Sequence, residues 1–263
     1  MVPRSLQELL LHCGYSISET PQLLLRDTLA AFSRIPYENL SKILRVADSR
    51  GGILKESPEE IVSGFIKHGS GGTCFALTST LCSFLRALGY EAHPILADRR
   101  YGQDTHCAVL CRISSESWEL LDPGYRIYTP CKIPLTGSVR YELLFSSIEL
   151  HATTPSTAEL FTTALNPIQS LSMRYRLTYK ITPVELDTFE RAWERSFSWD
   201  MMHYPIVSAV RDNSILYLQK NALRIHSPTG SVRTTVTYEQ IIAELADRLS
   251  MSRGLVKRAL ESL

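Results

Sequence analysis

The sequence predicts an α+β fold, in which a helical N-terminal part precedes a part rich in strands and a mixed C-terminal part. Apolar residues recur at helical spacing through much of the first 88 residues. From residue 90 the pattern changes to short strand-like runs bounded by turns, which continue to about residue 180. The last 80 or so residues mix both patterns. We therefore expect packed subdomains over residues 1–88, 89–185 and 186–263.

Start and stop residues define the expected N-terminal helices. A helix over 5–13 ends at Gly14, and a second helix opens at Pro21 and runs to about Phe32. The segment Ser57-Pro58-Glu59-Glu60 has a serine N-cap, a proline in the first turn and a glutamate three residues after the cap. That combination is typical of a helix start.

The remaining elements follow from apolar spacing and from prolines and glycines. Pro36 argues against a continued helix over 33–44. A helix over 74–88 is expected because its apolar residues lie three and four positions apart. Further along the chain we expect strands over 91–97, 105–113 and 117–122, two or three strands over 213–236, and one or two helices over 238–263.

Composition excludes several classes of protein. With 28 Lys+Arg against 27 Asp+Glu, the formal charge of +1 gives no electrostatic case for general nucleic-acid binding. No run of about 18 apolar residues predicts a membrane span, and the N-terminus lacks the pattern of a secretory signal. We therefore expect a cytoplasmic protein with six reduced cysteines, as a monomer or weak homo-oligomer. No zinc-ligand spacing is present, so no metal site is predicted.

Cys74 is the strongest candidate for chemistry. It follows Gly71-Gly72-Thr73 at the first turn of the expected helix, where free backbone N–H groups and the helix dipole stabilise a thiolate. A small buried residue at a helix start fits the same pattern, because free cysteine is among the most buried residue types.

His106 and Asp122 give Cys74 possible partners. His106 begins one expected strand and Asp122 ends the next, so an antiparallel hairpin would place them within a residue or two of each other. The imidazole would take the thiol proton, and the carboxylate would orient the imidazole and stabilise its charge. Taken singly, each residue fits a loop or turn position better than a catalytic one, and it is the combination with Cys74 that favours catalysis.

Four segments, in the same order along the chain, resemble the arylamine N-acetyltransferase family. Ile35-Pro36-Tyr37-Glu38-Asn39-Leu40 is similar to its I-P-F-E-N-L segment, and Gly71-Gly72-Thr73-Cys74-Phe75 to the segment around its nucleophile. His106 opens a strand as the catalytic histidine of the family does, and Asp122-Pro123-Gly124-Tyr125 resembles the D-V-G-F segment that supplies the aspartate. The resemblance implies a helical bundle, a β-barrel-like middle domain and a C-terminal α/β lid around a cysteine-protease-like catalytic core.

The resemblance also implies a reaction. Cys74 would take an acetyl group from acetyl-CoA as a thioester, and an aromatic amine or hydrazine would then attack it in a ping-pong mechanism. Acetyl-CoA would be a substrate rather than a bound cofactor. Tyr37, Phe75 and Tyr125 would contact the substrates, and the partners would be small molecules, without nucleic acid or membrane.

The chain departs from the family pattern at three positions. Ser70 replaces an arginine, Ala76 replaces an acidic residue, and Arg126 replaces a glycine. The first two changes together suggest an ion pair lost as a unit. An amide synthase that uses a larger or carrier-bound acyl thioester fits the same three residues, and so does a transglutaminase-like cysteine hydrolase.

The C-terminal segment allows one non-enzymatic interpretation. Residues 238–263 resemble a helix-turn-helix, with a short turn at 250–252 and a basic second helix. Two amphipathic helices that close the last domain fit the same pattern. The neutral charge of the whole chain favours the closing helices over DNA binding.

Overall fold

The computed structural model describes residues 2–49, 55–114, 117–144, 146–164 and 173–263. Within them, five helices precede the first long strand: α1 (Arg4–His12), α2 (Pro21–Phe32), α3 (Leu40–Asp48), α4 (Pro58–His68) and α5 (Cys74–Ala87). The predicted start of α4 is present as a reciprocal capping box between Ser57 and Glu60, and Gly69 ends α4 in the left-handed conformation. The sequence did not predict α3, which begins anew four residues after Pro36.

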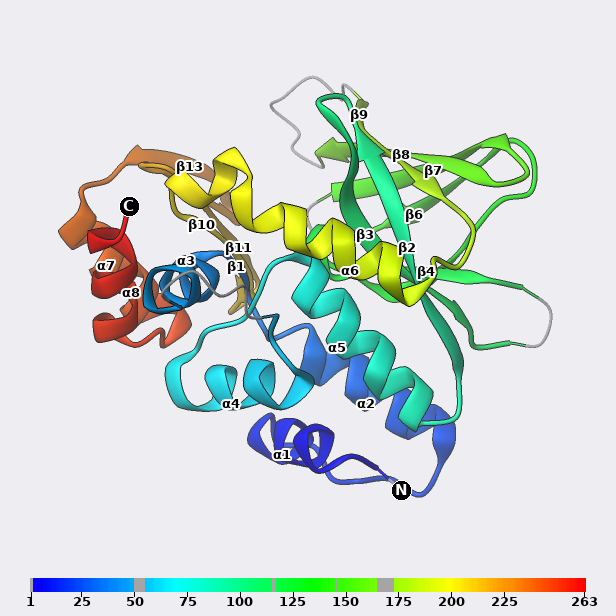
Figure 1. Ribbon diagram of the computed structural model, residues 1–263, viewed down its shortest axis with the longest axis horizontal. Helices are drawn as coiled ribbons and strands as arrows, with labels where there is room; N and C mark the ends of the chain where they lie inside the picture. The colour runs from blue at the N-terminus through cyan, green and yellow to red at the C-terminus, as the bar shows by residue number, and fades with distance from the viewer. Residues whose placement is uncertain (1, 50–54, 115–116, 145, 165–172) are drawn as a thin grey trace.

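The middle of the chain forms a nearly closed antiparallel barrel. In spatial order the described strands of its sheet are β5, β4, β3, β2, β9, β8, β7 and β6. Helix α5 packs on β2 and β3 and separates the N-terminal helices from the barrel (Figure 1). The strands of the barrel, in chain order, are β2 (Glu91–Arg99), β3 (Gly102–Arg112), β4 (Glu119–Asp122), β5 (Ile127–Lys132), β6 (Ser138–Glu142), β7 (Ser146–Thr154), β8 (Thr157–Ala164) and β9 (Arg174–Lys180).

A second antiparallel sheet follows the barrel and includes a short N-terminal strand. Its order is β1 (Tyr37–Glu38), β10 (Ile206–Arg211), β11 (Ser214–Gln219), β12 (Ala222–Ser227) and β13 (Gly230–Thr235). Because β1 pairs with β10, the Tyr37 segment is built into the C-terminal sheet. Between the two sheets the chain forms α6 (Leu186–Arg195) and the 3-10 turns η2 (Ser196–Ser198) and η3 (Asp200–His203).

The last two helices close the C-terminal sheet. Apolar residues of α7 (Tyr238–Leu249) and α8 (Arg253–Glu261) pack with Leu40 and Leu44 of α3 and with one face of β10, β11 and β12. In Figure 1 they lie beside α3, at the far side of the molecule from the barrel. This packing is that of closing helices, the second of the two interpretations of residues 238–263.

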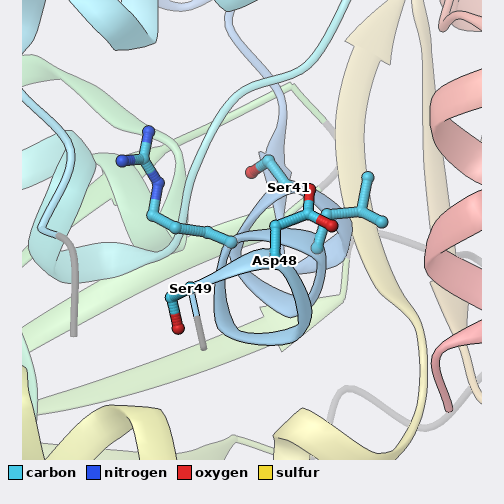
Figure 2. Close-up of a pocket in the computed structure, with 5 residues that line it drawn as sticks. Ser41, Asp48 and Ser49 are labelled. Atoms are coloured by element: carbon cyan, nitrogen blue, oxygen red, sulfur yellow. The ribbon is translucent and has the colours of Figure 1, made fainter. Parts of the chain in front are cut away.

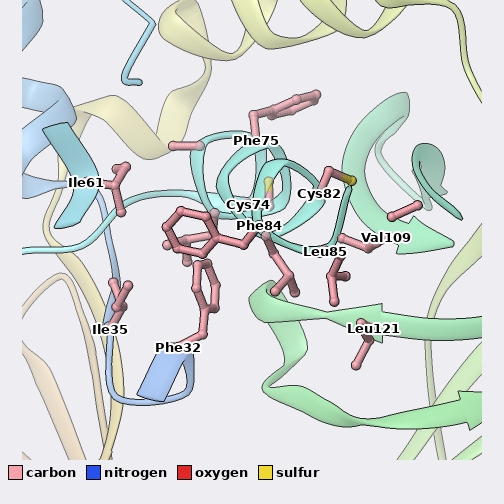
Figure 3. Close-up of a cluster of buried hydrophobic side chains, with 14 of the residues drawn as sticks. Phe32, Ile35, Ile61, Cys74, Phe75, Cys82, Phe84, Leu85, Val109 and Leu121 are labelled. Atoms are coloured by element: carbon pink, nitrogen blue, oxygen red, sulfur yellow. The ribbon is translucent and has the colours of Figure 1, made fainter. Parts of the chain in front are cut away.

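Three clusters of buried side chains hold these parts together. One fills the barrel, one lies beneath the C-terminal sheet, and the largest joins α1, α2, α4 and α5 to the outer face of β2 and β3. Figure 3 shows this largest cluster, in which Cys74 lies beside Phe75 at the start of α5. The predicted α+β fold, with its helical, barrel and mixed parts, is confirmed. None of the described helices is long and apolar enough to cross a membrane.

Candidate active site

The loop before Cys74 is held by the Pro36–Glu38 segment. The Glu38 carboxylate is fully buried and accepts the Gly71 N–H at 2.9 Å. The Gly72 carbonyl accepts the Glu38 N–H, and the Gly72 N–H donates to the Pro36 carbonyl. A Cβ on Gly71 would lie 1.9 Å from the Pro36 oxygen, so only glycine fits. The two segments that resemble the family therefore form one unit that positions the thiol.

The helix start at Cys74 offers unpaired backbone donors. The N-cap residue, Thr73, makes no side-chain cap, and the first intrahelical bond runs from the Leu77 N–H to the Thr73 carbonyl. The N–H groups of Cys74, Phe75 and Ala76 therefore have no intrahelical acceptor. Such donors, together with the positive end of the helix dipole, stabilise negative charge at the sulfur and on an oxygen beside it.

The side chains of His106 and Asp122 contact each other, and both residues are 0% exposed to solvent. His106 Nε2 lies 2.7 Å from Asp122 Oδ2, which also accepts the Tyr179 hydroxyl at 2.6 Å. The other carboxylate oxygen accepts the Tyr125 N–H at 3.1 Å. With Nε2 as the donor to Asp122, the second ring nitrogen, Nδ1, is left to act as the base.

The absence of a side chain at Gly124 lets the turn after Asp122 approach both His106 and Cys74 closely. A Cβ at this position would lie 2.6 Å from His106 Cε1 and 3.5 Å from the Cys74 Cβ. The backbone of the turn η1 (Pro123–Tyr125) therefore contacts both residues. Cys74, His106 and Asp122 converge where the start of α5 meets the end of β4, as the sequence predicts.

The electrostatics favour a thiolate at Cys74. Its pKa is lowered well below the ordinary range by a hydrogen bond from the Cys107 thiol, by the His106 imidazole and by the Arg99 guanidinium, against burial, which raises it. Burial and the Arg99 guanidinium lower the pKa of His106, but the Asp122 carboxylate and Cys74 outweigh them, so the pKa is raised. Proton transfer from the thiol to the imidazole is thus favoured from both sides.

Arg99 is a member of the site that the sequence did not indicate. The pairing of β2 with β3 shifts register between Ala97 and Arg99, and this bulge directs the guanidinium toward the triad. Arg99 Nη2 lies 3.1 Å from His106 Nδ1, while Nη1 donates to the Tyr101 hydroxyl and the Thr105 carbonyl. The bulge depends on how the two strands are paired, which the sequence alone did not specify.

The three predicted substrate contacts differ in their surroundings. Tyr37 and Tyr125 are partly exposed, and the Tyr125 ring meets the His106 ring edge-on at 5.2 Å. Phe75 is 0% exposed and packs against Phe189, Trp193 and Trp199. We therefore place Phe75 in the core beneath Cys74 and keep only the two tyrosines in the substrate pocket that we propose.

The departures from the family pattern lie close to the site. Ser70 and Ala76 are both buried. Charged residues at these two positions would form an ion pair inside the core, with the cost of removing both charges from water, and this chain avoids that cost. Arg126 adopts the left-handed conformation, with φ of 59°, directly after η1. Its guanidinium hydrogen-bonds to Ser208 of the C-terminal sheet.

All six cysteines are free and buried. Besides Cys74 they are Cys13, Cys82, Cys107, Cys111 and Cys131. Burial raises the pKa of Cys82 and Cys111 to about 12, so these thiols stay protonated. No group of three His, Cys, Asp or Glu residues arranged to hold a metal occurs in the part of the chain that the structure describes. Cys74 is distinguished from the other thiols by its lowered pKa and by its place at a helix start.

A shallow surface hollow of about 300 Å³ lies over α3. Figure 2 shows Ser41, Asp48 and Ser49, which line it together with Leu44 and Arg45. None of these described lining residues belongs to the triad.

The sequence and the fold are both similar to those of known proteins. A family model described as N-acetyltransferase matches residues 24–250. The sequence matches no curated protein. The fold is similar to that of the arylamine N-acetyltransferase of Mycobacterium marinum, at 17% identity, 97% coverage of each chain and a TM-score of 0.79.

Two further solved structures resemble the chain over nearly its whole length. The Salmonella typhimurium arylamine N-acetyltransferase is 14% identical with 100% coverage of both chains and a TM-score of 0.79. The M. marinum arylamine N-acetyltransferase in complex with CoA is 16% identical with 97% coverage of both chains and a TM-score of 0.77. The structures show the common fold, and the family model covers most of the sequence. The chain therefore belongs to the arylamine N-acetyltransferase family.

Proposed function

We propose that this enzyme transfers an acetyl group, or a related acyl group, from CoA to an aromatic amine or hydrazine through a thioester on Cys74. The observation that carries the proposal is the convergence of a thiol of lowered pKa, an imidazole held by Asp122 and the unpaired N–H groups of a helix start. This arrangement suits acyl transfer through a covalent intermediate.

In the first half-reaction, His106 Nδ1 takes the proton of the Cys74 thiol, and the sulfur attacks the carbonyl carbon of the acyl-CoA. The N–H groups at the start of α5 stabilise the oxyanion of the tetrahedral intermediate. The carbon–sulfur bond to CoA then breaks, and CoA leaves as the thiol after it receives the proton from the imidazolium. Asp122 stabilises the imidazolium while it exists.

In the second half-reaction, the amine nitrogen attacks the thioester carbon while His106 accepts a proton from it. Collapse of the second oxyanion releases the amide and returns the Cys74 thiolate. The partly exposed rings of Tyr37 and Tyr125, the second of which contacts His106, would suit an aromatic acceptor. Water attacking the same thioester would make the enzyme a hydrolase.

Release of free CoA in the presence and absence of an aromatic amine separates these reactions. The proposal predicts slow CoA release from acetyl-CoA alone beyond the first turnover, and fast steady release after addition of the amine. Parallel lines in a double-reciprocal plot at several amine concentrations would mark the ping-pong order. Equal release with and without any amine would support hydrolysis and contradict the proposal.

A further inference from the structure

Lys42, in the first turn of α3, is a buried lysine that is only 1% exposed. Its Nζ donates to the Ser196 hydroxyl of η2 and lies 4.1 Å from the centre of the Phe197 ring. Among the described residues it forms no ion pair with an acidic side chain. A hydroxyl and an aromatic face compensate only part of the cost of removing an ammonium from water. An apolar side chain of the same length would avoid that cost, so packing alone does not explain this lysine.

The contacts of Lys42 lead to the residue next to the nucleophile. The Ser196 hydroxyl also donates to the Trp193 carbonyl, so one hydroxyl joins α3 to the end of α6. The Trp193 ring is stacked on the Phe75 ring, with the two centroids 6.5 Å apart. Phe75 follows Cys74 directly at the start of α5. Lys42 is therefore connected to the nucleophile's helix through two residues of the α6–η2 segment.

The charged and titratable groups that act on Lys42 come from three other parts of the chain. Burial lowers the pKa of Lys42 to about 8, while Cys74 of α5, Glu56 before α4 and Cys107 of β3 each raise it. The side chain is therefore still charged at pH 7. Electrostatic coupling is mutual, so a thiolate at Cys74 that stabilises the ammonium is itself stabilised by the ammonium.

Glu56 neutralises Lys42 only in part. The Glu56 carboxylate is buried, and neither of its oxygens accepts a hydrogen bond from the residues that the structure describes. Arg45 Nε lies 3.9 Å from this carboxylate, so its charge is shared between two cations. Burial raises the pKa of Glu56, and Glu38 adds to that rise. Lys42 therefore keeps positive charge that acts on Cys74.

We propose that Lys42 is a positioning residue whose buried ammonium holds the α6–η2 segment beneath Phe75 and stabilises the thiolate of Cys74. This role rests on the proposed function, in which that thiolate is the nucleophile, and adds a residue to it. The thiolate then has two supporting cations, Arg99 from the barrel and Lys42 from the N-terminal helices. Both act through Cys74 and do not react themselves.

The pH profile of Cys74 alkylation tests the charge. Lys42→Met removes the ammonium and keeps the length of the side chain. We expect the pKa of Cys74 to rise, so that alkylation by iodoacetamide at pH 6 slows roughly three- to tenfold. Lys42→Arg keeps the charge and should return the midpoint to that of the wild type, and the exposed Lys67→Met is the matched control. An unshifted midpoint in Lys42→Met, or an equal shift in Lys42→Arg, would overturn the proposal.

Titration of Lys42 itself tests the coupling in the wild-type protein and needs no acyl donor. The NMR resonance of its ε-carbon, assigned from its absence in Lys42→Arg, is followed against pH in the wild type and in Cys74→Ala. Because the thiolate raises the pKa of Lys42, we expect the midpoint to fall by about half a pH unit or more in Cys74→Ala. That result supports the proposal even if the wild type turns over no acyl-CoA. Equal midpoints contradict it even if Cys74 carries an acyl group.

Discussion

At the scale of single residues, the proton transfer depends on three hydrogen-bond donors around Asp122 and on the two groups that contact His106 Nδ1. The Tyr179 hydroxyl, the Tyr125 N–H and His106 Nε2 all donate hydrogen bonds to the Asp122 carboxylate. These three bonds orient the carboxylate and stabilise its negative charge. Nδ1 faces Arg99 as well as Cys74. While the imidazole is neutral, Nδ1 accepts from Arg99. Once the thiol proton has moved to Nδ1, Arg99 remains as a cation beside the thiolate.

The first prediction concerns the thiolate of Cys74. Since its pKa is lowered, we expect alkylation by iodoacetamide to stay fast well below the free-thiol pKa of about 8.5 and to slow only at acid pH. A lowered thiol pKa keeps the reactive form present to lower pH, so the rate falls as pH decreases through that value. The rate is measured by intact mass against pH, with Cys74→Ala as control. A midpoint at or above 8.5 would exclude the thiolate–imidazolium pair.

The second prediction concerns Arg99, which we regard as a positioning residue. Arg99→Gln removes a cation that lowers the pKa of Cys74, so we expect alkylation near pH 6 to slow roughly three- to tenfold, with a shift of the pH profile to higher pH. Arg99→Lys should restore part of the rate, and the exposed neighbour Arg100→Gln should leave the profile unchanged. An unaltered profile in Arg99→Gln would show that the contact is only structural.

At the scale of elements, short segments far apart in sequence place the site. Glu38 holds the Gly71 loop, and the next residue, Asn39, bonds the carbonyls of Met201 and Tyr204 and the Ile206 N–H. Through these bonds the Tyr37–Asn39 segment joins the loop before α5 to the start of β10 in the C-terminal sheet. The Tyr37–Asn39 segment is therefore a connector, and the nucleophile depends on it although it does not react.

The third prediction tests this connector through Gly71. Gly71→Ala would bring a Cβ within 1.9 Å of the Pro36 oxygen, so the backbone must separate. We expect the free energy of unfolding, from urea denaturation, to fall by about 2 kcal/mol or more. Gly254→Ala is the matched control, because its nearest contact would be 3.8 Å away and alanine favours a helix. Equal stabilities of the two variants would contradict the proposed role of the loop.

At the scale of the whole molecule, local signals in the sequence predicted most helices and several strands. Caps, apolar spacing and turn residues predicted α4, α5 and the hairpin that carries His106 and Asp122, because each signal lies within one element or one turn. The pairing of β1 with β10 could not be predicted, since β1 has only two residues and its partner lies far along the chain. Arg99 and the place of Arg126 were missed for the same reason, because both depend on the register between strands.

The sheets and helices meet around one thiol, and we propose that this thiol carries the acyl group. The direct measurement is the intact mass of the protein after incubation with acetyl-CoA alone. We expect a mass increase of one acetyl group, absent in Cys74→Ala and lost from the wild type when an aromatic amine is added. An acetyl group that persists in Cys74→Ala, or no adduct with any of several acyl-CoAs, would contradict it.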